Sequence, residues 1–288
     1  MTLFIDLRAT PNGGIVAAEA TVWDDGTRPV PATEFAERVR GLDVLLATHG
    51  FNVDRQQGID ALSKWGGLCQ LPPSSLFVGV LWPGDSQFFP VIDYPFEGTE
   101  AITSGKLLAD FLNENAANAA SLSFVSHSLG ARTVLEAITG LNIAAVRRLI
   151  IMAGAIEDDC LVNEYQDAAA KAAEIFVLSS RSDAVLEFAF PVGNLVGEIV
   201  MRGHPYDKPA LGRDGPSQPI PLSQRGGAWQ IPDPWDYGHL DYLPRAAIAP
   251  QIPPPVAAPT QTSNVPVNPA VNGWKPSWSA GAISTQMD

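Results

Sequence analysis

The stretch Ser121-Leu-Ser-Phe-Val-Ser-His-Ser-Leu-Gly-Ala-Arg-Thr-Val-Leu135 joins two kinds of apolar pattern. Its first half is a short apolar run, typical of a buried strand, and from Leu129 onward apolar residues recur at helical spacing. Ser128 stands at the junction, between the small residues Ser126 and Gly130, which let backbone pack against backbone in a sharp turn. We predict a nucleophile elbow that lifts the Ser128 hydroxyl out of a sheet. The alternative is an ordinary strand-turn-helix with a capping serine.

Apolar runs alternate with helical patterns on both sides of this stretch. The further strands are predicted at 43–48, 76–82, 148–153 and 174–179, and the further helices at 31–40, 54–65, 99–118 and 167–173. Strands that are apolar along their whole length are buried on both faces. The pattern therefore predicts an α/β fold, a mostly parallel sheet with helices on both faces. Residues 3–8 and 15–23 are expected to add two strands, with 3–8 at an edge of the sheet.

The composition changes near the end of the chain. Residues 1–248 hold the predicted elements and are expected to form one α/β domain, whereas residues 249–288 are rich in proline and nearly uncharged. A segment of this composition is expected to be an extended tail without a core of its own. Trp274 and Trp278 suggest that its end docks on the domain or on a partner.

Charge and composition exclude several functions. The net charge of −13 would repel polyanions, so no nucleic-acid partner is expected. No run of about twenty apolar residues predicts a membrane span, and the N-terminus has no leader pattern. The cysteines, Cys69 and Cys160, favour free thiols in a reducing, cytoplasmic compartment. The four histidines are far apart and no phosphate-binding loop is present, so neither a metal nor a cofactor is expected.

Four short motifs follow predicted strands, and the carboxyl ends of parallel strands meet at one edge of a sheet. They are His49-Gly-Phe51, Trp82-Pro-Gly-Asp85, Ser128 and Ser180-Arg-Ser-Asp183. A serine hydroxyl becomes a good nucleophile when a base takes its proton, and histidine is the usual base. The chain order that accompanies this kind of elbow is serine, acid, histidine.

The candidate bases are His204 and His239, the histidines that follow Ser128. We favour His239, because it lies in a polar and aromatic loop after the last plausible strand, near residue 220 or 229. Asp183 is the favoured acid, because it follows the strand 174–179 directly. Its rivals follow the strand 148–153 and are Glu157, Asp158 and Asp159. Asp183 could instead cap the next helix, since aspartate is a good N-cap.

The oxyanion of an acyl-transfer reaction needs two preorganised donors. We expect them to be the backbone N–H groups of Leu129, which starts the elbow helix, and of Phe51, where Gly50 lets the backbone come close. His49 and His127 are expected to be structural. The substrate pocket is expected to lie between the loop 82–96 and the apolar segment 184–201, with the side chains Trp82, Phe88 and Phe188.

These motifs together resemble the α/β-hydrolase superfamily. They are His49-Gly-Phe-Asn52, Trp82-Pro-Gly84, the helix 99–118, Ser126-His-Ser-Leu-Gly130 and His239-Leu-Asp-Tyr242. More narrowly, residues 40–245 are similar to bacterial serine-esterase-like hydrolases of largely unassigned function. Ser126 replaces the usual glycine, and the Pro-rich tail has no counterpart.

The resemblance implies a metal-free Ser-His-Asp hydrolase that acts on an ester, a thioester or a related acyl bond of a small molecule. A thioesterase or acyltransferase on the same site is the nearest alternative. A hydrolase-like scaffold that binds without turnover is a second alternative. Oligomeric state and natural substrate are not predicted.

Overall fold

A computed structural model describes residues 2–11, 14–69, 71–85, 94–142, 146–188, 190, 208–219, 225–231 and 233–242. Its strands are β1 (Leu3–Arg8), β2 (Val16–Asp24), β3 (Arg28–Val30), β4 (Asp43–Thr48), β5 (Ser75–Leu81), β6 (Ser121–His127), β7 (Val146–Met152), β8 (Ala172–Ser179) and β9 (Arg225–Gln230). Its helices are α1 (Ala32–Val39), α2 (Arg55–Leu68), α3 (Tyr94–Asn115), α4 (Gly130–Gly140), α5 (Gln166–Lys171), α7 (Leu211–Asp214) and the short 3₁₀ helix η1 (Asp233–Trp235). The predicted tail 249–288, His204 and Phe88 lie outside the described residues.

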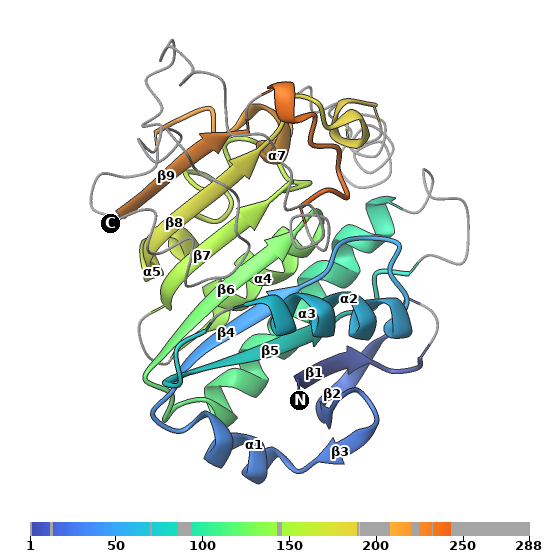
Figure 1. Cartoon of the computed structure of the whole chain (residues 1–288), viewed down its shortest axis with the longest axis vertical. Helices are drawn as coiled ribbons and strands as arrows, with labels where there is room; N and C mark the ends of the chain where they lie inside the picture. The colour runs from blue at the N-terminus through green and yellow to red at the C-terminus, as the bar shows by residue number, and fades with distance from the viewer. Residues whose placement is uncertain are drawn as a thin grey trace.

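The strands form one nine-stranded sheet in the order β3-β2-β1-β5-β4-β6-β7-β8-β9 (Figure 1). The pairs β1–β2 and β2–β3 are antiparallel, and every other neighbouring pair is parallel. This arrangement confirms the predicted α/β class with a mostly parallel sheet. The last strand, expected near residue 220 or 229, is β9. It pairs with β8 and places Trp229 opposite Leu178.

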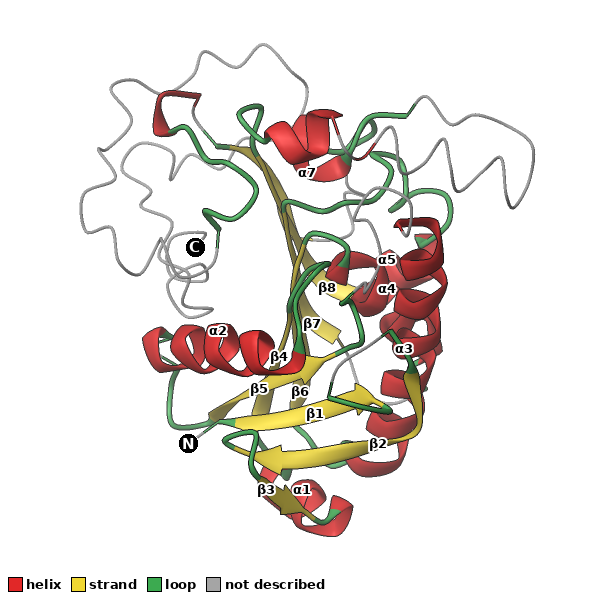
Figure 2. Ribbon diagram, turned by 90° about the vertical axis from the view of Figure 1, so that its right-hand side faces the viewer, coloured by secondary structure: helices red, strands yellow, loops and turns green. Residues whose placement is uncertain are grey.

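Helices cover both faces of the sheet, with α2 on one face and α3, α4 and α5 on the other (Figure 2). The start of α2 is fixed by a capping box. The Asp54 carboxylate accepts from the Gln57 N–H at 2.8 Å, and the Gln57 amide oxygen accepts from the Asp54 N–H at 3.1 Å. The helix continues through Gly66, where a β-carbon would lie 2.7 Å from the ring of Phe77. The glycine thus lets α2 pack closely on β5 instead of ending the helix.

The alternating sequence predicted that the first strand lies at an edge of the sheet, and this prediction was wrong. β1 lies between β2 and β5, and its residues are buried. Its polar side chains are buried as ion pairs, Asp6 with Arg55 at 2.6 Å and Arg8 with Asp85. Alternation of polar and apolar residues usually indicates a half-exposed strand. In β1 the polar side chains are buried as well, because each is neutralised by an oppositely charged partner.

The carboxyl ends of the parallel strands face one edge of the sheet, as the shared direction of β4, β5, β6, β7 and β8 requires. The loops after these ends carry the candidate functional residues. No helix in the described part of the chain is both long and apolar enough to cross a membrane.

Candidate active site

Ser128 occupies the turn between β6 and α4. Its φ is +54°, in the left-handed region that non-glycine residues rarely adopt. Its N–H donates to the carbonyl of Met152 at 3.0 Å, and its carbonyl accepts from the N–H of Ala131 at 3.1 Å. Strained backbone of this kind persists only where the surrounding structure holds it, and such residues cluster at functional sites.

Two glycines allow the loop after β4 to pack directly against this turn. A β-carbon on Gly130 would lie 2.3 Å from the His49 carbonyl oxygen. A β-carbon on Gly50 would lie 2.8 Å from the Ser128 β-carbon. Both contacts are far inside normal van der Waals distance, so each position requires glycine. Ser126, by contrast, is tolerated in place of a glycine and is fully buried.

The side chains of Ser128, His239 and Asp183 lie in one hydrogen-bonded series. His239 Nε2 is 2.7 Å from Ser128 Oγ, and His239 Nδ1 is 2.8 Å from Asp183 Oδ2. Because a carboxylate only accepts, Nδ1 carries the proton and Nε2 is left to accept from the serine hydroxyl. The series is shielded from solvent, with side-chain exposures of 10% for His239 and 0% for Asp183.

Asp183 uses both carboxylate oxygens. While Oδ2 faces His239, Oδ1 accepts from the backbone N–H of Leu186 at 3.0 Å and caps the helical turn that begins at residue 184. The Asp183 N–H donates to the Ser180 carbonyl at 3.2 Å. The sequence presented capping and orientation of the histidine as alternatives, and the structure has one carboxylate in position for both.

The loop that carries His239 is tethered at several points. The Asp241 carboxylate accepts from the Gly238 N–H at 2.9 Å, and the Ser180 hydroxyl donates to the Tyr237 carbonyl at 2.7 Å. The Tyr242 ring is fully buried edge-on against Tyr237, with ring centroids 5.7 Å apart. Burial and the nearby Asp183 carboxylate raise the pKa of Tyr242 well above its usual value, so the phenol stays neutral.

The side chain of Trp82 packs against the loop after β4. The Trp82 indole N–H donates to the His49 carbonyl at 2.9 Å. The Trp82 ring also stacks on the His49 imidazole, with ring centroids 5.8 Å apart. The Asn52 N–H donates to the Gly84 carbonyl, which links this loop to the one after β5. Trp82 was expected to border the pocket. Trp82 is fully buried, and its ring is stacked on the ring of His49.

Arg8 is a second support that the sequence did not reveal. Its side chain is fully buried at the end of β1, pairs with Asp85, and donates to the Val53 carbonyl at 2.6 Å. It thereby fixes the loops after β4 and β5 relative to each other. No short motif marks such a residue, because its partners are distant in sequence.

The remaining histidines near the site are neutral. Burial lowers the pKa of His49 to about 3, with the Arg8 cation adding to the effect. His49 Nδ1 donates to the Gly50 carbonyl at 2.9 Å, inside its own loop. Burial also lowers the pKa of His127 to about 3, and the neighbouring His239 contributes.

The rival acids lie in other interactions. The backbone N–H of Asp158 donates to the Pro209 carbonyl, and the Asp158 side chain is hydrogen-bonded to Ser217. Glu157 pairs with Arg132 at 3.1 Å, and Asp159 pairs with Lys208. Two other side chains, Phe88 and Phe188, were expected to line the substrate pocket. Phe188 is 68% exposed, and Phe88 is outside the described residues.

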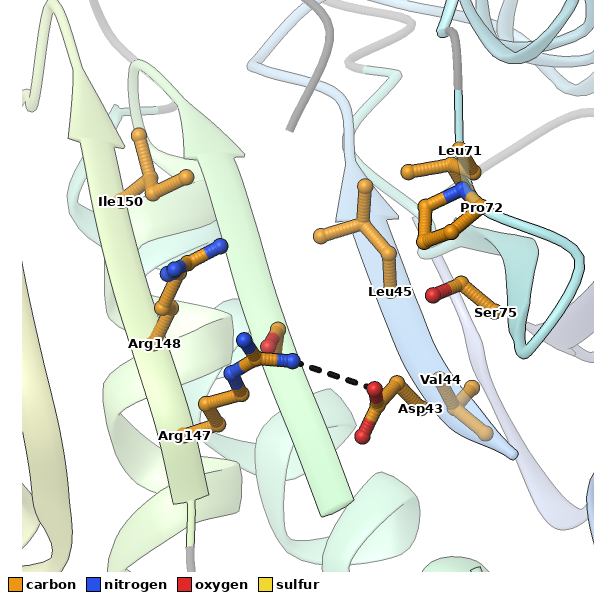
Figure 3. A pocket seen from close by; sticks show the side chains of 10 residues that line it. Asp43, Val44, Leu45, Leu71, Pro72, Ser75, Arg147, Arg148 and Ile150 are labelled. Atoms are coloured by element: carbon orange, nitrogen blue, oxygen red, sulfur yellow. Dashed lines mark hydrogen bonds and ion pairs between the residues drawn. The ribbon is translucent and has the colours of Figure 1, made fainter. Parts of the chain in front are cut away.

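A pocket elsewhere in the molecule is distinct from this site. It lies at the amino ends of the strands and includes Asp43, Ser75, Arg147 and Arg148 (Figure 3). Its arginines are already paired, Arg147 with Asp43 at 3.1 Å and Arg148 with Glu174. In the part of the chain that the structure describes, no three histidine, cysteine or acidic side chains gather as a metal site.

The sheet order and a serine in a strained strand-to-helix turn define an α/β hydrolase. The chain belongs to the family described as "Alpha/beta hydrolase of unknown function (DUF900)", whose model matches residues 32–214. The match includes Ser128 and Asp183, whereas His239 lies beyond it. None of the curated proteins matches the chain significantly.

Several solved structures show limited similarity to the chain. Esterase PE8 is 18% identical, with a TM-score of 0.36, over 69% of this chain and 86% of that one. A hyperthermophilic esterase from the archaeon Pyrobaculum calidifontis is 11% identical, with a TM-score of 0.36, over 70% of each chain. The Pyrococcus furiosus esterase Pf2001 is 11% identical, with a TM-score of 0.35, over 77% of this chain and 79% of that one.

Proposed function

We propose that the chain is a serine hydrolase that cleaves a carboxylic ester through an acyl-enzyme on Ser128. The observation that supports this proposal is the series of hydrogen bonds from Asp183 through His239 to Ser128, at 2.8 and 2.7 Å. A scaffold that only binds its ligand has no need of a base aligned on a strained serine. We therefore favour catalysis over binding without turnover.

In the first half of the reaction, Ser128 Oγ attacks the ester carbonyl while its proton passes to His239 Nε2. A bond forms between Oγ and the carbonyl carbon. The bond from that carbon to the alcohol oxygen then breaks, and the alcohol leaves with the proton from Nε2. Asp183 keeps the proton on Nδ1 and stabilises the imidazolium that forms between these steps.

In the second half, water attacks the acyl group and gives a proton to His239 Nε2. The bond between the acyl carbon and Oγ breaks, the proton returns to Ser128, and the carboxylic acid leaves. The tetrahedral oxyanion of each half is bound by the N–H groups of Leu129 and Phe51. Leu129 precedes the first residue of α4, so its N–H is a helix-terminal donor with no partner inside the helix.

Ester hydrolysis by matched variants tests the proposal. Wild type should turn over p-nitrophenyl butyrate, and Ser128→Ala should lower kcat by about 10³-fold or more. Ser123→Ala is the control, because it makes the same change on β6, the strand that leads into the elbow, at a position away from the turn. Absence of turnover by wild type on p-nitrophenyl esters and on a matched thioester would overturn the proposal. Equal activity of Ser128→Ala and wild type would overturn it as well.

A further inference from the structure

His127, the residue before the serine, donates a hydrogen bond to the loop that carries the base. Its Nε2 lies 2.6 Å from the backbone carbonyl oxygen of His239. A carbonyl only accepts, so Nε2 of His127 carries the proton and, in the neutral ring, Nδ1 does not. The tautomer of this histidine is therefore fixed by its partner.

The ring of His127 is enclosed by three segments of the site. His127 is only 3% exposed. The centroid of its ring lies 5.0 Å from the ring centroid of His239 and 6.2 Å from the ring centroid of Tyr242. On the other side, a β-carbon on Gly50 would lie 2.9 Å from His127 Nδ1. The elbow, the loop after β4 and the loop of His239 thus meet at this ring.

We propose that His127 is a positioning residue, whose Nε2–H holds the main chain of His239 so that the imidazole stays within reach of Ser128. This inference rests on the proposed function. The hydrogen bond between Gly238 and Asp241 lies within the loop of His239, and the one between Tyr237 and Ser180 joins this loop to the segment after β8. The bond from His127 instead joins His239 itself to the residue that precedes the nucleophile.

The neutral state of His127 suits this role. His239 becomes a cation during the reaction, and a second imidazolium 5.0 Å away would disfavour that cation. Burial and the neighbouring His239 both keep His127 uncharged. The bond can therefore hold the base in place without opposing its protonation.

Substitutions that keep or remove the donor test the proposal. His127→Gln places an amide N–H near the position of Nε2, and His127→Leu fills similar space without a donor. His127→Leu should lower kcat on p-nitrophenyl butyrate by about 10²-fold with KM within about twofold, as a misplaced base does. His127→Gln should retain kcat within about fivefold. Ile138→Ala, a buried change at the far end of α4, should lower the melting temperature without lowering kcat.

Two kinetic outcomes would overturn the role of His127. One is a kcat of His127→Leu equal to that of wild type, and the other is an equal loss in the Leu and Gln variants. If His127→Leu fails to fold, ¹⁵N NMR of wild-type histidines decides the question. The proposal requires a neutral, Nε2-protonated His127 from pH 5 to 9, and a proton on Nδ1 would overturn it. Fluorophosphonate labelling of wild type separates the two failures. The proposed function predicts labelling of Ser128 whatever the role of His127, and an unlabelled wild type would mean that the proposed function itself has failed.

Discussion

Gly130 and His49 are packed so closely that a β-carbon on residue 130 would lie 2.3 Å from the His49 carbonyl oxygen. The same carbonyl accepts the Trp82 indole N–H at 2.9 Å. The first turn of α4 and the loop after β4 therefore form one packed unit. In the proposed reaction, this unit holds both oxyanion donors.

The contact predicts that Gly130→Ala disturbs both stability and activity. The new methyl group must displace backbone, which typically costs about 1–3 kcal/mol. It should also lower kcat, because the loop that carries Phe51 moves away from Ser128. Urea denaturation and ester hydrolysis measure the two effects.

Gly67→Ala in α2 is the matched control for this change. A β-carbon there meets nothing within 4 Å, so the variant should be as stable as wild type or more stable by up to about 1 kcal/mol. A Gly130→Ala protein with wild-type stability and activity would show that the packed unit is not needed.

Asp183→Asn should lower kcat by about 10⁴-fold. The amide oxygen would still accept from the Leu186 N–H, which leaves the amide NH₂ facing His239 Nδ1. His239 would then carry its proton on Nε2 and could not accept from Ser128. The melting temperature should change little, because the cap remains. Asp158→Asn is the control and should retain kcat; a larger loss there would transfer the role of the acid to Asp158.

The buried neutral histidines predict a loss of stability in acid. Each has a pKa near 6.5 when unfolded and about 3 when folded, so the unfolded chain binds more protons between these values. The stabilisation is complete above pH 6.5 and is lost as pH falls toward 3. The expected slope is about 1.4 kcal/mol per pH unit for each histidine.

Denaturation of wild type and His127→Gln at pH 7.5 and 4.5 measures that slope. The variant removes one titrating group that faces His239, His49 and Tyr242, so its stability should fall less steeply than that of wild type. Parallel slopes in the two proteins would mean that His127 does not resist protonation in the fold.

Trp82→Phe should weaken the support beneath the loop after β4. The change leaves the buried His49 carbonyl without its indole donor, which typically costs about 1–3 kcal/mol. We expect kcat to fall several-fold as the loop loosens. Trp65→Phe, a buried change on α2 against Phe77, should lower stability while leaving kcat unchanged. Equal kcat in both variants would argue against a role for Trp82 in the site.

Much of the parallel sheet could be predicted, because its strands are short and apolar along their length. β4 has the bounds that its sequence indicated, 43–48. β1 was misplaced at an edge because Asp6 and Arg8 look solvent-exposed in a sequence, although both are buried as ion pairs. A pattern of residue types does not reveal partners that lie tens of residues away.

The same limit applies to the candidate site. Ser128 is recognisable because the elbow is local, and Asp183 because it follows a strand directly. The structure brings both together with His239, whereas their roles in catalysis remain our proposal. Arg8 and the bond from His127 to the His239 carbonyl could not be predicted, since they depend on how separate loops meet. The helix α2 was predicted to end at Trp65, but close packing of Gly66 on Phe77 lets it continue to Leu68.

The central claim is that Ser128 is an activated nucleophile, and mass spectrometry after reaction with a fluorophosphonate tests it most directly. The account predicts a single adduct on wild type, located on the peptide that contains Ser128, and no adduct on Ser128→Ala. It also predicts slow labelling of His239→Ala, in which the serine is present without its base. An unlabelled wild type, or an adduct that persists in Ser128→Ala, would contradict the account.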